Sequence, residues 1–301
     1  MNLTDPIYSD PELARQHIER LHWPNGPVCP HCGCMGRITK LEGKSTRPGV
    51  HKCNDCTKPF TVTVGTIMED SKIPLNKWLM AYALINASKK GISAHQLHRS
   101  LGITYKSAWF LAHRIRETMD SGSDPLGGSP ERIVEADETF VGGKAKNRAN
   151  KKTAPKSVVF TLVERGGHAR SFHVANVHAT TLRPILFKNA DRLSTLMTDE
   201  STSYTAAGIQ FWQHKTVNHR SHEYARGTWH TNTAENFFSI FKRGIVGVYH
   251  HISEAHLHRY CREFDFRYNT RTMKDAERTV EALKGARGKR LIYRQPRSLA
   301  A

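Results

Sequence analysis

Acidic side chains gather in one short stretch of this chain, Val134 to Gly143, which reads VEADETFVGG. Alternating β-branched, aromatic and acidic residues followed by two glycines are typical of a strand that ends in a turn. Because successive side chains of a strand point to opposite faces, Glu135 and Asp137 share one face and Glu138 lies on the other. A single acid here would usually be a turn residue or half of a surface ion pair. Three carboxylates so close together in a basic chain instead favour a divalent cation site.

Two further acids lie where a second strand and a helix are expected. The segment Ser194 to Thr198 is predicted to be a strand that ends at Asp199. Two hydrophobic strands that each end in an acid can lie side by side, which would bring Asp137 and Asp199 together. Glu235 lies near the start of an expected helix, where Asn232 precedes it with the spacing of a capping box. Glu235 therefore has two interpretations, a metal ligand or a helix cap.

Four of the six cysteines occur as two C-x-x-C pairs, Cys29-Pro-His-Cys32 and Cys53-Asn-Asp-Cys56. Thiolates from two such knuckles complete the tetrahedral shell of one zinc ion and leave no position for water. The pattern therefore predicts one structural Zn²⁺ in a zinc ribbon, with a redox dithiol as the alternative. Paired cysteines also favour a reducing compartment over disulfide bonds.

Composition indicates a soluble protein with a polyanionic partner. The chain has 301 residues, 38% of them hydrophobic, 18 histidines and a formal net charge of +18. This excess of positive charge favours nucleic acid, because no basic amphipathic helix with a broad apolar face suggests a membrane surface. No long apolar run and no charged-then-apolar leader are present in the sequence. A cytoplasmic, nucleoid-associated protein is expected.

Residues 71–122 have the pattern of a helix-turn-helix domain. A helix begins after Pro74, and two shorter helices follow, capped by Ser93 and Thr104 and separated by a turn at Gly102. In this interpretation the second short helix presents a DNA-binding surface. Its candidate residues are Tyr105, Lys106, His113, Arg114 and Arg116. The alternative is an ordinary helical bundle with solvated charges.

Three other segments are defined by composition. Residues 120–130 are rich in Gly, Ser and Pro and are predicted to be a linker. The loop from Lys144 to Lys156 is basic, and its Lys151 and Lys152 are candidates for holding a phosphate backbone, although a solvated charge run is the default. Residues 271–301 are predicted to be a basic C-terminal tail, either a further nucleic-acid contact or a disordered end.

Taken in order, these motifs resemble the DDE transposases of bacterial insertion sequences, in the group with an N-terminal zinc ribbon and helix-turn-helix ahead of a ribonuclease-H-like domain. The resemblance covers about residues 15 to 275. It rests on CPHC, CNDC, GTIMEDSKIPLNKW, KKGISAHQLHRSLGI, VEADETFVGG, LMTDESTSY and HTNTAENFFSIFKRGIVGVYHHISEAHLHRYCREFDFRYN.

The resemblance implies a multidomain enzyme whose α/β catalytic domain has a mixed sheet. The first acid would be on the first strand, the second after the fourth, and the third on a helix packed against the sheet. Asp137, Asp199 and Glu235 would bind two Mg²⁺ (or Mn²⁺) ions that catalyse cleavage and strand transfer of double-stranded DNA. His230 is a candidate to orient the nucleophile or contact the scissile phosphate, and Lys242 to hold a phosphate. Terminal inverted repeats would be the bound sites, and a homodimer or higher oligomer would assemble on them.

The expected domains are residues 1–70, an N-terminal helix and zinc ribbon; 71–122, the helix-turn-helix; 131–270, the catalytic domain; and 271–301, the tail. Relatives in this group can carry Asn in place of the third acid, so Asn232 and Glu235 both stay candidates. Two alternative functions also stay open. A zinc-ribbon DNA-binding regulator would need no carboxylates, and a metal-dependent endonuclease would need no strand transfer.

Overall fold

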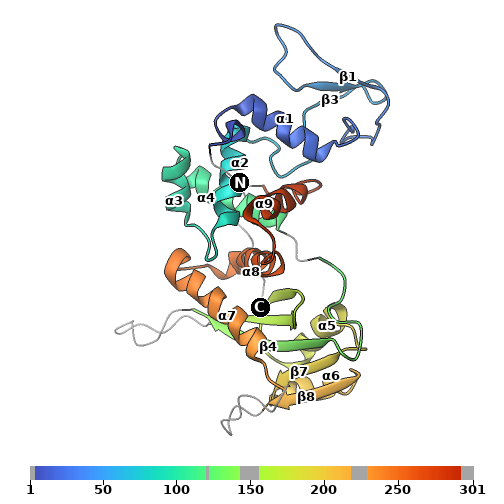
Figure 1. Cartoon of the computed structure of the whole chain (residues 1–301), viewed down its shortest axis with the longest axis vertical. Coiled ribbons are helices and arrows are strands. Elements are labelled where there is room, and N and C mark those ends of the chain that lie inside the picture. Colours follow the sequence, from blue (N-terminus) through green and yellow to red (C-terminus); the bar gives the residue numbers. More distant parts are fainter. Residues whose placement is uncertain (1–3, 120–121, 143–155, 218–228, 293–301) are drawn as a thin grey trace. The chain divides into compact units, whose positions relative to one another are not determined.

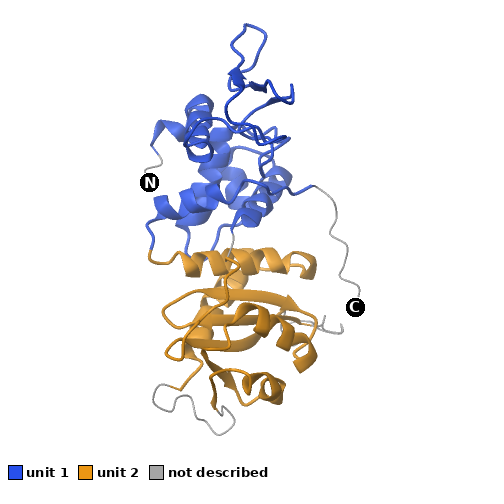
Figure 2. Cartoon of the chain, turned by 90° about the vertical axis from the view of Figure 1, so that its right-hand side faces the viewer, with its two compact units in different colours: residues 1–120, 273–295 blue, residues 121–272, 296–301 orange. Residues whose placement is uncertain are grey.

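The computed structural model describes residues 4–119, 122–142, 156–217 and 229–292. The chain divides into two compact units, one made of residues 1–120 with 273–295 and the other of residues 121–272 with 296–301 (Figure 2). Each unit has its own buried side chains. The division after residue 120 falls at the start of the predicted linker.

The N-terminal part of unit 1 is a small three-stranded antiparallel sheet. The 3-10 helix η1 (Pro6–Tyr8) and the helix α1 (Pro11–His22) precede the strands β1 (Ile38–Lys40), β2 (His51–Cys53) and β3 (Pro59–Phe60), which pair in that order. Asp10 begins α1 by accepting the backbone N–H groups of Glu12 and Leu13. The strands are so short that the buried apolar cluster here is formed around only Cys29, Cys53 and Phe60.

Helices make up the rest of unit 1. They are α2 (Leu75–Ala87), α3 (Ala94–Leu101), α4 (Tyr105–Thr118) and α9 (Asp275–Lys284). The expected caps of the two short helices are confirmed: Ser93 accepts the N–H of Gln96, Thr104 accepts the N–H of Ser107, and Gly102 ends α3 in the left-handed conformation, φ 58°.

The C-terminal segment differs from the expected tail. Within residues 271–301, α9 is a regular helix whose Ala282 and Leu283 are buried, and it belongs to unit 1. The Arg278 guanidinium donates to the carbonyl of Asn86 at the end of α2, at 2.9 Å. Composition suggested a solvated tail because it counts charges, but the apolar side of α9 is what packs.

Unit 2 is built on a five-stranded mixed sheet with the order β6-β5-β4-β7-β8. Its strands are β4 (Ile133–Val141), β5 (Ser157–Glu164), β6 (Ala169–Val174), β7 (Thr195–Asp199) and β8 (Gln213–Val217). β4, β5 and β6 pair antiparallel, whereas β7 pairs in parallel with β4 and with β8 (Figure 1). The antiparallel strands β5 and β6 are consecutive in the chain and form a hairpin.

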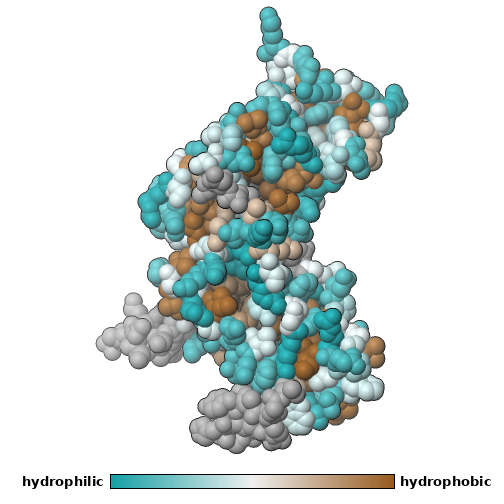
Figure 3. All heavy atoms as spheres, viewed as in Figure 1, coloured by the Kyte–Doolittle hydropathy of each residue, from teal (hydrophilic) through white to brown (hydrophobic). Residues whose placement is uncertain are grey.

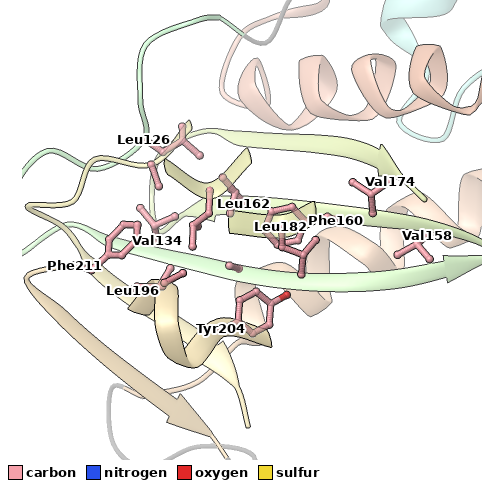
Figure 4. Close-up of a cluster of buried hydrophobic side chains, with 14 residues drawn as sticks. Leu126, Val134, Val158, Phe160, Leu162, Val174, Leu182, Leu196, Tyr204 and Phe211 are labelled. Carbon is pink, nitrogen blue, oxygen red and sulfur yellow. The ribbon is translucent and has the colours of Figure 1, made fainter. Parts of the chain in front are cut away.

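Helices cover both faces of this sheet. One face packs against α5 (Ala179–Asn189), η3 (Thr202–Tyr204) and α6 (Thr205–Gly208), and its buried cluster includes Val134, Phe160, Leu162, Leu196 and Tyr204 (Figure 4). The other face packs against α7 (Asn232–Gly244), the π-helical turn η5 (Ile245–Tyr249) and α8 (Glu254–Asn269). Cys261 is buried in this second cluster, as its place in the apolar pattern of α8 predicts.

Part of the predicted linker is structural. Leu126 is buried in the first of these clusters, its N–H donates to the carbonyl of Asn189 at 2.8 Å, and its carbonyl accepts the N–H of Asp191 at 2.8 Å. Gly127 has φ +90°, and a Cβ there would lie 1.9 Å from the Ser194 hydroxyl. Glycine is therefore required at this position by close packing as well as by backbone conformation.

Among the described residues, no helix combines the length and the apolar character needed to cross a membrane. Hydrophilic residues prevail on the face of the molecule drawn in Figure 3, and hydrophobic residues form separate smaller groups among them.

Candidate functional site

Asp137 and Asp199 lie on neighbouring parallel strands in matching positions. The register of β4 and β7 runs from Ile133↔Thr195 to Glu135↔Met197. The same offset, continued by two residues, sets Asp137 beside Asp199 at the end of β7. Adjacent strands are about 4.8 Å apart, and laterally paired side chains point to the same face. This continued offset, together with the effect of the Asp199 charge on the pKa of Asp137, indicates that the two carboxylates lie near each other.

Glu235 reaches the same face from α7. Ala234, Phe237, Phe238 and Phe241 of α7 pack on the sheet face to which Glu135 and Asp137 point. Glu235 itself is exposed in the first turn. The capping box of Asn232 and Glu235 is not formed, because α7 begins after Thr231 and no side chain caps it from within the helix. The expected capping box is thus wrong, and Glu235 Oε1 instead accepts a hydrogen bond from the hydroxyl of Thr231, the residue that precedes α7, at 3.5 Å.

The neighbouring acids affect Asp137 electrostatically. The pKa of Asp137 is raised to about 7, first by burial and then by the negative charges of Glu138, Asp199 and Glu235, although the N–H of Glu138 opposes the shift. Such a shift marks like charges held close together in a poorly solvated place, where a cation would relieve the repulsion. The oxygens of the three acids do not all lie within 4.8 Å of one another; of the residues described, only cysteine-containing groups meet that limit.

Glu138 points to the opposite face of β4 and forms a separate contact. It accepts a hydrogen bond from the Tyr204 hydroxyl of η3. Burial raises the pKa of Glu138, the bond from Tyr204 opposes this, and the charge of Asp199 adds to it. Glu138 thus borders the acidic site from the other side of the strand.

Glu135 has a role that sequence reasoning missed. Its side chain is fully buried, and its carboxylate binds the start of α7: Oε2 accepts the N–H of Ala234 at 2.9 Å and Oε1 accepts the Thr233 hydroxyl at 2.9 Å. Oε1 also accepts Nε of Arg165, which follows β5, at 2.5 Å. A strand residue two positions before Asp137 therefore supplies the acceptor that a helix usually obtains from its own cap residue.

His230 lies in the same network. The Arg165 guanidinium donates to the His230 carbonyl at 2.6 Å and to ring Nδ1 at 3.1 Å. Because a guanidinium has no acceptor, Nδ1 must accept this bond, and the neutral ring then carries its proton on Nε2. No sequence signal marked Arg165, which looked like a residue of the β5–β6 hairpin turn. The sequence shows acids at 135 and 137, but it does not show that Glu135 binds the start of α7 whereas Asp137 lies among other acids.

The DNA-binding candidates have different positions. Tyr105 and Lys106 are exposed in the first turn of α4, and the Tyr105 ring stacks on His95 at 4.2 Å. Lys242 is exposed on α7, two turns after Glu235. Lys151 and Lys152 lie outside the described residues.

The prediction that Arg114 lies on an exposed DNA-binding surface is wrong. Arg114 is 7% exposed, donates to the carbonyl of Glu69 at 2.9 Å and lies 5.0 Å from the centre of the Phe110 ring. Burial lowers its pKa. His113 and Arg116 are buried as well. The amphipathic pattern identified one inward face of α4, but other segments of unit 1 also cover the face that carries these residues.

The zinc-ribbon cysteines form a tight cluster. Sγ of Cys29 lies 3.6 Å from Sγ of Cys56, and Sγ of Cys32 lies 3.5 Å from Sγ of Cys53. Four sulfurs about 2.3 Å from one tetrahedral zinc ion would be about 3.8 Å apart, so the cluster fits this ion. Backbone N–H groups of Cys56 and Asp55 help to lower the pKa of Cys53 to about 6, which favours a thiolate ligand. Cys34 lies outside the four-cysteine group.

Comparison with known families agrees with both parts of the chain. Residues 9–59 match the transposase zinc-ribbon domain, and residues 125–269 match the ISXO2-like transposase domain. The chain belongs to this family of transposases. A relative from Halobacterium salinarum, named "Uncharacterized protein in transposable element ISH50", is 27% identical over 274 residues, which are 84% of this chain and 89% of the relative. The transposase domain match contains Asp137, Asp199 and Glu235, and the ribbon match contains all four clustered cysteines.

Proposed function

We propose that this transposase binds the terminal inverted repeats of an insertion sequence and catalyses metal-dependent cleavage and strand transfer of DNA. The observation that carries the proposal is the raised pKa of Asp137, about 7, which results first from burial and then from nearby negative charges that include Asp199 and Glu235; the register of β4 and β7, continued by two residues, agrees with it. Acids held together against their repulsion are typical of a cation site.

The sheet supports a ribonuclease-H-like catalytic domain. β4 is the first strand of unit 2 and holds Asp137, and β7 is the fourth and ends at Asp199. A mixed sheet with the first acid on its first strand, the second at the end of its fourth and the third on a helix is the arrangement that the resemblance implies. Rigid strands and a packed helix would fix the carboxylates within the narrow tolerance of a metal site.

In this mechanism Asp137, Asp199 and Glu235 would hold two Mg²⁺ or Mn²⁺ ions. When bound, such ions lower the pKa of an attacking water or 3′-hydroxyl and stabilise the leaving oxygen of an in-line phosphoryl transfer. His230, with its ring proton on Nε2, would donate a hydrogen bond to a phosphate oxygen or to the nucleophile. Lys242 would bind a neighbouring phosphate from the same side of α7, because seven residues correspond to almost two full turns.

DNA recognition is assigned to unit 1. The pair α3 and α4, joined at Gly102, would act as a helix-turn-helix, with Tyr105 and Lys106 as exposed base or phosphate contacts. The net charge of +18 and the basic loop that contains Lys151 and Lys152 would add affinity that does not depend on sequence. A homodimer or higher oligomer would pair the two ends of the element.

The test is cleavage and joining of labelled element ends in Mg²⁺ and Mn²⁺. Asp137→Asn, Asp199→Asn and Glu235→Gln keep side-chain size but remove charge, so each should reduce both steps by several orders of magnitude. Because the three acids act as one site, a double variant should be little worse than a single one. Folding and DNA binding should change little.

Matched variants address the alternatives. Asn232→Ala should keep most activity; a normal Glu235→Gln together with an inactive Asn232→Ala would move the third ligand to Asn232. Joining of pre-cut ends distinguishes a transposase from an endonuclease that only cleaves. Inertness of the wild type with both metals, combined with tight specific binding, would favour a regulator instead.

A further inference from the structure

We infer that Glu135 and Arg165 are positioning residues that hold Glu235 and His230 at the acidic site. Together with Thr233 and the backbone of His230 and Ala234 they form what we call the β4–α7 clamp. The inference rests on the proposed function, because it assigns to the clamp the geometry of the metal ligands. The clamp residues are not themselves proposed to touch metal or DNA.

The clamp joins the first acid to the third by a short path. Asp137 lies two residues after Glu135 on β4, and Glu235 directly follows Ala234, whose N–H donates to Glu135 Oε2 at 2.9 Å. A displacement of the start of α7 along the sheet would therefore change the spacing of the two acids only by stretching or breaking this bond. The Thr233 hydroxyl, at 2.9 Å from Glu135 Oε1, prevents rotation of the same turn.

Charge and burial make the clamp rigid. Glu135 is 0% exposed and its partner Arg165 is 19% exposed at the side chain, with 2.5 Å between Nε and Oε1. The carboxylate also lies at the N-terminus of α7, where the helix dipole favours negative charge. Loss of either partner would leave a buried charge unpaired, so the arrangement has a strong preference for one geometry.

Arg165 connects Glu135 to His230, the second residue that the clamp positions. Its guanidinium binds both the carbonyl and Nδ1 of His230, which fixes the backbone before α7 and the tautomer of the ring. A lysine at 165 would keep the charge but lack the planar fork that makes these contacts together.

The test compares clamp variants with a matched ion pair on the same hairpin. Arg132, which directly precedes β4, and Glu164, which ends β5, form an ion pair at 2.8 Å, and the side chain of Arg132 is 58% exposed. Full-length Glu135→Gln and Arg165→Lys should weaken Mn²⁺ binding, measured by paramagnetic resonance, by about 10- to 100-fold, as losses of groups that orient metal ligands usually do. Arg132→Gln should leave it unchanged.

Two more readouts separate positioning from general stability. Hydrogen exchange of residues 230–240 should increase in the clamp variants while the β5–β6 hairpin stays protected. With DNA in excess, kcat should fall and the KM for DNA should stay nearly constant. Thr233→Val, which removes only one hydroxyl, should show a weaker form of both changes. Thr233→Ser, which keeps the hydroxyl, should behave as the wild type.

The inference would be overturned if folded Glu135→Gln kept the Mn²⁺ affinity and the hydrogen exchange of the wild type. If Glu135→Gln does not fold, the same result in Thr233→Val would overturn it. These readouts need no DNA chemistry, so they also separate failure of the clamp from failure of the proposed function. If Asp137→Asn abolishes Mn²⁺ binding and clamp variants do not weaken it, only the clamp is wrong. If the wild type binds Mn²⁺ through the clamped acids but cleaves no DNA, only the function is wrong.

Discussion

Carboxylates of unit 2 differ in function because their surroundings differ. Glu135 is buried but paired with Arg165, so it acts as a structural anion. Asp137 is largely buried and lies among acids, and burial and their negative charges raise its pKa to about 7. Asp265 on α8 is 1% exposed and accepts the N–H and the hydroxyl of Ser171 at 2.8 and 2.6 Å. Residue type alone does not distinguish these roles, whereas burial and partners do.

Asp265 provides a prediction of pH dependence. Burial raises its pKa to about 7, although the bonds from Ser171 oppose the shift. Its pKa in the folded chain is thus above the ordinary value of 3.8. The folded state then binds the proton more tightly than the unfolded state, so the stability this group contributes is present at low pH and lost as pH rises through 7.

Asp265→Asn removes this titration and keeps acceptor and donor atoms for Ser171. The variant should therefore gain stability relative to wild type between pH 5 and pH 7, by at most about 1.4 kcal/mol per pH unit. Thermal unfolding at several pH values measures the gap. Asp124→Asn, an exposed acid of the same unit, is the control. A gap that stays constant with pH would show that Asp265 is charged in the folded state throughout.

At the scale of elements, local patterns were sufficient for much of the fold. Ser93, Gly102 and Thr104 act on their own turns, and the alternation of β4 predicts which side chains share a face. The order of the strands was enough to expect Asp137 near Asp199, although Asp137 lies in the middle of β4 and only Asp199 ends its strand. These features could be predicted because the interactions that determine them lie within a few residues or repeat along a strand.

Long-range pairs could not be predicted in this way. Glu135 binds Arg165 and Ala234, which are 30 and 99 residues away along the chain. Arg114 is covered by groups such as the Glu69 carbonyl, 45 residues away. A charged residue in an amphipathic pattern is assigned to solvent by default, and only the packed structure shows that a second element lies over it.

The zinc ribbon has a smaller buried apolar cluster than either face of the sheet in unit 2. Its strands have three, three and two residues, and its buried cluster contains two of the cysteines. Metal binding should therefore supply most of its folding free energy. Purified protein should hold one zinc ion, and Cys29→Ser or Cys56→Ser should lose it and expose residues 25–65 to amide exchange, with α3 and α4 still protected.

Cys34→Ser is the matched control for that prediction, because Cys34 is a nearby thiol outside the group of four. It should retain the zinc ion. Loss of zinc from Cys34→Ser but not from Cys29→Ser would reassign the ligands to the alternative group of Cys34, Cys53 and Asp55. Full protection of residues 25–65 in a chelator would show that the ribbon folds without metal.

At the scale of the whole molecule, charge and recognition are separable. The chain has 45 basic and 27 acidic residues, which attract any DNA, whereas base discrimination requires particular exposed side chains. Tyr105 and Lys106 are exposed on α4, whereas Arg114 is buried and is therefore not expected to contact bases. Sequence preference is therefore expected from the first turn of α4, and general affinity from the basic segments.

Salt dependence tests this separation. Each phosphate contact contributes about −0.9 to the slope of log K against log salt concentration on duplex DNA. Lys151→Gln with Lys152→Gln should make the slope less steep by about two and weaken binding to element ends and to unrelated DNA by similar factors. Lys106→Gln should instead reduce the ratio between the two affinities, because it changes a contact in the proposed base-reading turn. The measurement is fluorescence anisotropy on both DNAs over a range of salt concentrations. A double lysine variant with an unchanged slope and an altered ratio would show that the basic loop, and not α4, distinguishes the element ends.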